Sequence, residues 1–173
     1  MSERSRNLPR RSCLAVPASS QKMLKKAQFL AADMVFLDLE DSVAPLEKEP
    51  ARDNAVKAIN EGEWGERVLG VRVNAWDTKW TYRDVIHIVE NSSERLDIVM
   101  LPKVQSADQI KALDLLLTQI EATIGRPSRV GIEAQIETTR GLINVDDICA
   151  AVRAAFARRR RLPSRGRASS ATP

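Results

Sequence analysis

Short apolar runs, rich in β-branched residues, alternate with helix-like segments through the first 150 residues. The runs cover residues 13–17, 34–39, 68–74, 97–103 and 129–137, and the helix-like segments cover 20–32, 47–62, 78–92, 106–125 and 139–151. Ser106, with Asp108 and Gln109 after it, predicts a capped start for the fourth helix. Strand–helix units joined by short connections form parallel strands with right-handed crossovers, so an α/β fold is expected.

Two architectures fit this alternation, a doubly wound open sheet and a (β/α)8 barrel. No GxGxxG or GxxxxGK[ST] string follows any apolar run, which removes support from the nucleotide-binding open sheets. Polar residues stand at the end of every run, as they do where a barrel builds its site at the C-terminal mouth of the strands. We therefore predict a TIM-barrel type fold over residues 1–150, incomplete at about five of eight β/α units.

The composition changes near Ala151. Residues 151–173 contain seven arginines and no acid, whereas the other 20 basic residues face all 23 acidic ones, so the positive net charge of +4 comes from this segment. We predict a disordered Arg-rich tail over 151–173. It is a basic arm that touches an anionic partner, a solvated tail, or the result of truncation or frame disruption of a longer barrel, and the last interpretation is preferred.

The bulk properties point to a cytoplasmic globular protein. Hydrophobic residues make up 43% and charged residues 29% of the 173-residue chain, and no apolar stretch is long enough to span a membrane. Cys13 and Cys149 lack CxxC spacing and have apolar neighbours, so buried reduced thiols are expected.

Three acids end the second apolar run, MVFLDLEDSV. Strand alternation places Asp38 and Glu40 on one face and Asp41 on the other. Carboxylates are rarely buried unless they are paired or bind a metal. The acids therefore either face a site at the barrel mouth or form an acidic cluster before a helix.

Arg72 and Glu137 are the strongest single candidates for chemistry. An unpaired guanidinium within the apolar run VLGVRVN would be costly, and its planar fork suits a carboxylate or a developing oxyanion. A structural ion pair with Glu40 or Asp41 is the alternative. Glu137 ends the fifth run and is either a ligand for Mg²⁺ or a cap on the following helix.

Five strings together carry a family resemblance: RSCLAVPASSQKMLKKA (11–27), LDLEDSV (37–43), VRVN (71–74), MLPKV (100–104) and IETTRGLIN (136–144). In this order and spacing the sequence resembles the citrate lyase β-subunit and malyl-CoA lyase-like proteins of the HpcH/HpaI aldolase family. The resemblance covers roughly residues 11 to 150 and implies a TIM-barrel carbon–carbon lyase.

The reaction that the resemblance implies is Mg²⁺-dependent, reversible cleavage of a hydroxyacyl-CoA into an acyl-CoA and a 2-oxo acid. Glu137 would bind Mg²⁺, and Arg72 would bind substrate and stabilise charge. Glu40 and Asp41 would lie beside the metal and orient waters or Arg72. Among further residues, Lys103 is a substrate-binding candidate or a solvated lysine, and Lys26 could meet CoA phosphates.

The sequence also departs from the family. The second metal carboxylate, expected in a GxxD-like string after a sixth strand, has no counterpart after Ala151. Full-length relatives are expected to be homo-oligomers, and activity in this truncated chain is left open.

Two rival functions are an aldolase that acts on free 2-oxo acids without CoA, and a non-catalytic fragment whose basic tail binds nucleic acid. Aromatic residues do not interleave with the arginine run, which counts against nucleic-acid recognition.

Overall fold

The computed structural model describes residues 8–161, and the side chains of residues 158–161 are left out of the description. The elements are β1 (Cys13–Pro17), α1 (Gln21–Ala27), β2 (Met34–Asp38), a 3₁₀ turn η2 (Pro45–Glu47), α2 (Lys48–Glu61), β3 (Val68–Arg72), α3 (Thr81–Asn91), β4 (Ile98–Leu101), α4 (Ala107–Thr123), β5 (Gly131–Ala134), α5 (Thr139–Ile143) and α6 (Val145–Arg161). The five predicted strand–helix units are confirmed.

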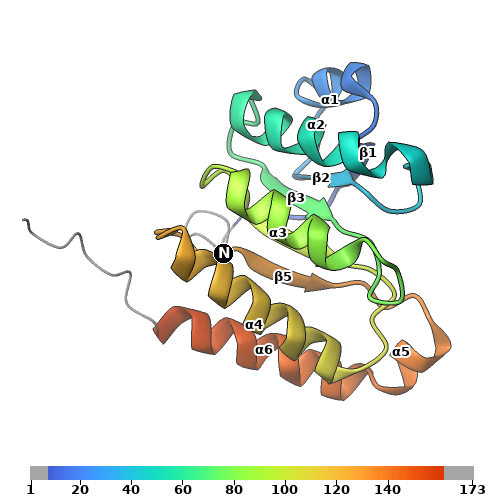
Figure 1. The fold of residues 1–173 in the computed structure, drawn as a ribbon, viewed down its shortest axis with the longest axis vertical. Coiled ribbons are helices and arrows are strands. Elements are labelled where there is room, and N and C mark those ends of the chain that lie inside the picture. Colours follow the sequence, from blue (N-terminus) through green and yellow to red (C-terminus); the bar gives the residue numbers. More distant parts are fainter. Residues whose placement is uncertain (1–7, 162–173) are drawn as a thin grey trace, which may run out of the picture.

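The strands form one sheet in sequential order, β1-β2-β3-β4-β5, and every neighbouring pair is parallel. Sequential order with right-handed crossovers places the connecting helices on one face of the sheet. Helices α2, α3 and α4 accordingly lie together along one side of the strands (Figure 1). This is the arrangement of successive units in a (β/α)8 barrel, and the described residues supply five of its strands.

The helix-facing side of the sheet carries the main core. Because side chains alternate along a strand, each central strand sends every second residue to the helices. The resulting cluster includes Val35, Leu37, Leu69, Val71 and Val99, all fully buried. Burial on both faces explains why these runs are apolar without alternation.

A second, smaller cluster occupies the opposite face of the sheet, which is the interior side of a barrel. Met34, Val68, Ile98 and Met100 pack there, with Phe36 and Leu8 against them. Just after Leu8, Arg10 forms an ion pair with Glu133 of β5 at 3.0 Å. The N-terminal segment therefore crosses the inner face near the start of the strands, leaving the polar groups at the other end.

Helix α6 occupies the first part of the segment that was predicted to be a disordered tail. It continues through Ala151 to Arg161, so a tail that begins at residue 151 is wrong for residues 151–161. Ile148, Ala151 and Ala155 follow helical spacing and are buried, and α6 lies beside α4 (Figure 1). Ile148 and Ala151 fall within the predicted helix-like segment 139–151, whereas Ala155 extends the buried stripe into the arginine-rich segment. Residues 162–173 of the predicted tail lie outside the described residues.

The expectation of buried thiols is also wrong. Cys13 and Cys149 are free and exposed. Cys13 lies on β1, which pairs with β2 alone among the described residues, and Cys149 is an exposed position of α6. Within residues 8–161, none of the helices combines the length and apolar character needed to cross a membrane.

Candidate active site

Arg72 and Asp38 form the centre of the polar end of the inner face. They are direct neighbours in the β2–β3 register, as the last residues of their strands. Arg72 Nε donates to Asp38 Oδ1 at 2.8 Å and Nη2 donates to Oδ2 at 2.7 Å, a bidentate pair. The expected ion pair between Arg72 and Glu40 is confirmed, at 3.4 Å, but the closer, bidentate partner of Arg72 is Asp38.

The remaining edge of the Arg72 guanidinium faces the barrel interior. Its Nη1 lies 3.4 Å from Glu40 Oε2 and donates to Gln135 Oε1 at 3.5 Å, a weak contact. The Phe36 ring lies beneath it, with the guanidinium carbon 5.4 Å from the ring centroid. Hydrogen bonding to Asp38 raises the pKa of Arg72, which stays charged. Nη1 is thus the corner of the fork that a ligand oxygen could take.

Asp38 remains ionised although it is buried. Burial pushes its pKa upwards, but hydrogen bonds from Arg72, from Ser42 and from the Glu40 N–H outweigh this effect and hold the pKa below the usual value. The two backbone donors lie at 2.9 Å (Glu40) and 3.2 Å (Ser42). Asp38 therefore fixes Arg72 on one side and the turn after β2 on the other.

Glu40 behaves differently from Asp38. It is only 4% exposed, and burial raises its pKa despite the nearby positive charges of Lys103 and Arg72. Lys103 Nζ lies 2.9 Å from Glu40 Oε1. Two cations, Lys103 and Arg72, contact this carboxylate through its two oxygens. Because its pKa is raised and that of Asp38 is lowered, Glu40 takes up a proton at a higher pH than Asp38 does.

Lys103 contacts the acidic pair, Glu40 and Asp41, and also Glu137. Its ammonium contacts Glu40 and, at 3.3 Å, Asp41 Oδ1, and hydrogen bonding to Glu40 raises the lysine pKa. Its own N–H donates to Glu137 Oε1 at 2.9 Å. Lys103 has a left-handed backbone with φ of 52°, which is uncommon for a residue with a side chain. The expected alternative of a merely solvated lysine does not fit these contacts.

Glu137 extends from the β5 end as an exposed carboxylate. The helix that follows is capped by Thr138, whose Oγ1 accepts from the Gly141 N–H at 3.0 Å, so Glu137 is not the capping residue. Any Cβ at Gly141 would overlap the Val104 carbonyl oxygen. This close approach brings the start of α5 against the strand-4 loop and keeps Glu137 beside Lys103.

The residues present offer part of a magnesium site. Mg²⁺ in proteins is often held by one or two carboxylates together with waters and substrate oxygens. Glu137 fits the role of one such carboxylate, because among the described residues only its Oε1 is engaged, by a single N–H. Glu40 and Asp38 are committed to cations. Across residues 8–161 no group of three or more ligating side chains converges on one point.

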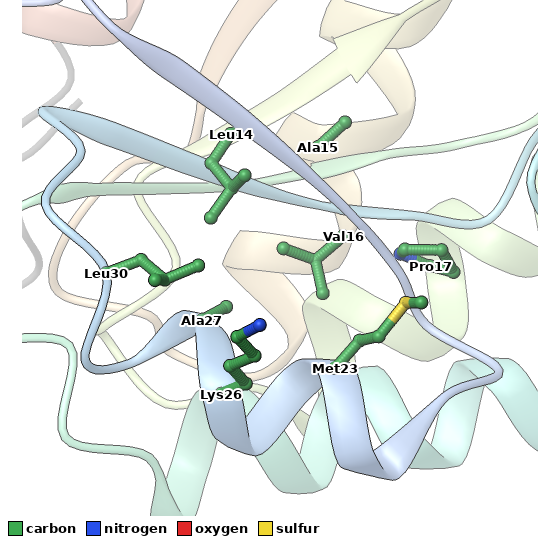
Figure 2. Close-up of a pocket in the computed structure, with 8 residues that line it drawn as sticks. All are labelled: Leu14, Ala15, Val16, Pro17, Met23, Lys26, Ala27 and Leu30. Atoms are coloured by element: carbon green, nitrogen blue, oxygen red, sulfur yellow. The ribbon is translucent and has the colours of Figure 1, made fainter.

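Lys26 is separate from this cluster. It lies on α1 and lines a groove between α1 and β1, together with apolar residues such as Leu14, Val16 and Leu30 (Figure 2). The groove reaches Pro17, which pairs with Asp38 at the end of β2. Thus the structure brings together Arg72, Glu40, Asp41, Lys103 and Glu137, and leaves Lys26 outside their network.

The sequence placed Asp38 among the acids at the mouth but did not identify it as the Arg72 partner, and it did not identify Gln135 as a neighbour of Arg72. The parallel register could have identified the Asp38–Arg72 pair, because these residues end adjacent strands of equal length. Gln135 stands two residues before Glu137 and therefore shares its face of the strand.

Comparison with known families decides the relationship. The family model described as HpcH/HpaI aldolase/citrate lyase matches residues 11–157. The chain belongs to this family. The matched range contains all the residues of the polar cluster as well as most of α6.

Curated relatives agree. An L-malyl-CoA/beta-methylmalyl-CoA lyase of Rhodobacter capsulatus is 44% identical over 135 residues, 78% of this chain and 42% of the relative. A citrate lyase subunit beta of Leuconostoc mesenteroides subsp. cremoris is 34% identical over 140 residues, 80% of this chain and 45% of the relative. The chain therefore spans less than half the length of these relatives.

A solved structure of a citrate lyase beta subunit also resembles this chain in fold and sequence. The citrate lyase beta subunit of Mycobacterium tuberculosis, complexed with oxaloacetate and magnesium, matches with a TM-score of 0.60 and 31% identity. The match covers 82% of this chain and 55% of that one.

Proposed function

We propose that the protein acts in carbon–carbon bond cleavage of a hydroxyacyl-CoA, giving an acyl-CoA and a 2-oxo acid, with Mg²⁺ as cofactor. One observation carries this proposal: the Arg72 guanidinium and the exposed Glu137 carboxylate lie at the same end of the sheet. Asp38 holds the guanidinium through two hydrogen bonds, and its remaining edge faces Gln135. An oxygen ligand for Mg²⁺ and a fixed cation at one mouth suit a substrate that carries adjacent carbonyl and carboxylate oxygens.

Each residue has a separable task. Glu137 would hold Mg²⁺, which supplies Lewis-acid polarisation of a substrate oxygen when bound. Arg72 would bind a carboxylate oxygen or the oxygen on which negative charge develops as the carbon–carbon bond breaks. It needs no reorganisation, because Asp38 and Phe36 already fix its plane.

The acidic pair and Lys103 would organise the space between these groups. Glu40 and Lys103 neutralise each other at 2.9 Å, while Asp41 is exposed at the rim. This leaves Asp41 placed to hold waters of the cation and Glu40 placed to keep Nη1 of Arg72 aimed inwards. The relative from M. tuberculosis that was solved with oxaloacetate and magnesium supports the choice of Mg²⁺ and a 2-oxo acid as the ligands to test.

Calorimetric titration with oxaloacetate, with and without Mg²⁺, tests the proposal directly. We expect Mg²⁺-dependent binding that is lost in Glu137→Gln and strongly weakened in Arg72→Lys, whereas Lys57→Gln on the outer side of α2 changes nothing. Binding that ignores Mg²⁺, or that survives Glu137→Gln, would refute the metal assignment.

The acyl carrier is tested separately. Cleavage of malyl-CoA is compared with cleavage of free 4-hydroxy-2-oxo acids, which carry no CoA, at equal Mg²⁺ concentration. Turnover of the thioester alone supports the lyase, and turnover of the free acids supports a CoA-independent 2-oxo acid aldolase instead. Lys26→Gln should raise the KM for the thioester if the α1 groove receives CoA.

A further inference from the structure

Lys48 is a buried lysine behind the polar mouth, on the helix side of the sheet. It is the first residue of α2, and 5% of it is exposed. Its ammonium lies 2.7 Å from the Leu39 carbonyl oxygen, 2.6 Å from the Glu40 carbonyl oxygen and 2.7 Å from Asn74 Oδ1. An ammonium has three N–H donors, so every one of them is used.

The partners of Lys48 are themselves fixed. Asn74 Nδ2 donates to the Leu39 carbonyl at 3.0 Å and to Asp84 Oδ2 at 2.6 Å. Asp84 in turn accepts from Arg52 Nε at 2.6 Å. Among the described residues no carboxylate lies within ion-pair distance of Lys48, and its three hydrogen bonds go to two peptide oxygens and one side-chain amide oxygen. The lysine is therefore anchored to the backbone of the turn rather than to an acid.

This turn is the one that carries the acidic pair. Leu39 faces the helices and Glu40 faces the barrel interior, where its carboxylate meets Arg72 and Lys103. Two successive carbonyl oxygens held by one ammonium fix the peptide planes on both sides of the Glu40 Cα. The direction of the Glu40 side chain follows from those planes.

We propose that Lys48 is a positioning residue, which holds the Leu39 and Glu40 carbonyls from behind and so keeps the Glu40 carboxylate between Arg72 and Lys103. The consequence for ligand binding rests on the proposed function, whereas the geometric claim does not. A buried ammonium is costly, and burial lowers the pKa of Lys48. A methionine would fill the same space without that desolvation cost. We therefore attribute the ammonium to its hydrogen bonds with the Leu39 and Glu40 carbonyl oxygens.

Hydrogen exchange of the turn amides tests the geometric claim without any ligand. In Lys48→Met we expect the Glu40, Ser42 and Val43 amides to exchange at least about tenfold faster, with β4 and α4 amides changed less than twofold after allowance for global stability. The Val43 N–H is informative because it donates to the same Glu40 carbonyl, at 3.1 Å.

Two control variants separate this effect from general destabilisation. Lys57→Met removes an exposed lysine of the same helix and should change no amide. Arg52→Met removes a buried cation of the same polar group that does not touch the turn carbonyls. If Arg52→Met accelerates the turn amides as much as Lys48→Met does, or if Lys48→Met accelerates turn and core amides equally, the positioning role is refuted.

A double-mutant cycle of Lys48→Met with Glu40→Gln tests whether Lys48 acts through Glu40. For Mg²⁺-dependent oxaloacetate affinity we expect the double variant to lose no more than about twofold beyond the weaker-binding single variant. Multiplicative losses would reduce Lys48 to a structural lysine. The same cycle on the unfolding equilibrium constant in urea needs no ligand. If the unaltered chain does not bind oxaloacetate, the proposed function fails, while exchange and the urea cycle still decide the role of Lys48.

Discussion

Arg72 and Asp38 end adjacent parallel strands at the same height and share two hydrogen bonds, of 2.8 and 2.7 Å. Register alone brings them together, and the bidentate geometry then fixes the plane of the guanidinium. The cation of the candidate site is thus aimed by the sheet itself rather than by a loop.

The first prediction concerns this pair. Arg72→Met leaves Asp38 buried at 1% side-chain exposure without its counter-ion, and should lower the free energy of unfolding by about 3 kcal/mol. Urea denaturation measures the loss. Adding Asp38→Leu should restore part of the stability, because the uncompensated charge is removed while the Glu40 and Ser42 N–H groups lose their acceptor. A double variant as unstable as Arg72→Met would contradict this account.

The second prediction concerns pH. The folded pKa of Asp38 is lowered, so its stabilising contribution is complete above the ordinary value of 3.8 and is lost as pH falls through the lowered value. Asp33 acts in the same direction, since hydrogen bonding to Arg11 lowers its pKa to about 2. Urea midpoints between pH 5 and pH 2 should fall less steeply in Asp33→Asn. An unchanged slope would argue against the Arg11–Asp33 contact.

The third prediction concerns Glu40, whose pKa is raised. Here the folded chain takes up a proton more readily than the unfolded chain, so ionised Glu40 costs stability at neutral pH and this cost disappears as pH falls through the raised value. Glu40→Gln should therefore be more stable than the unaltered chain at pH 7, by on the order of 1 kcal/mol, and equal to it near pH 4. The exposed Asp41→Asn is the matched control and should show no such crossover.

The fourth prediction concerns the backbone of Lys103. Lys103→Gly and Lys103→Ala both remove the ammonium, but glycine accepts a φ of 52° without the steric cost that alanine incurs. The glycine variant should be more stable than the alanine variant by about 1 kcal/mol. Equal urea midpoints would mean that residue 103 does not hold the left-handed conformation.

The fifth prediction concerns Gly141. A methyl group there would overlap the Val104 carbonyl oxygen, so Gly141→Ala should destabilise the chain by about 1–3 kcal/mol. It should also weaken Mg²⁺-dependent oxaloacetate binding, because α5 and Glu137 move with the displaced backbone. Leu142→Ala, at an exposed neighbouring position, serves as the control and should leave both measurements unchanged.

The fold was predictable because doubly buried strands leave a plain signal, and each apolar run became a strand within a few residues. Finer contacts were less predictable. Ser106 begins α4 as expected, yet its side chain forms no capping bond, and Gln109 Oε1 instead accepts from the Gln105 N–H at 2.7 Å. Helix α6 was cut short because its buried face consists mostly of alanine, which carries little hydrophobic contrast.

The site was predictable in membership more than in connectivity. Arg72, Glu40, Asp41, Lys103 and Glu137 all stand at strand ends, which places them at one mouth. Which acid pairs with Arg72 depends on register, and a pattern of apolar runs does not specify register to one residue. Lys48 gave no signal at all, because a lysine at a helix start normally lies in water.

Because side chains alternate along β2 and β3, the candidate site depends on the register between these two strands. A slip of one residue between these strands would send Asp38 and Arg72 to opposite faces of the sheet. The cation would then point into the apolar helix layer, and no ligand oxygen could reach it. Binding of a ligand oxygen by Arg72 at this mouth therefore requires the native register between β2 and β3.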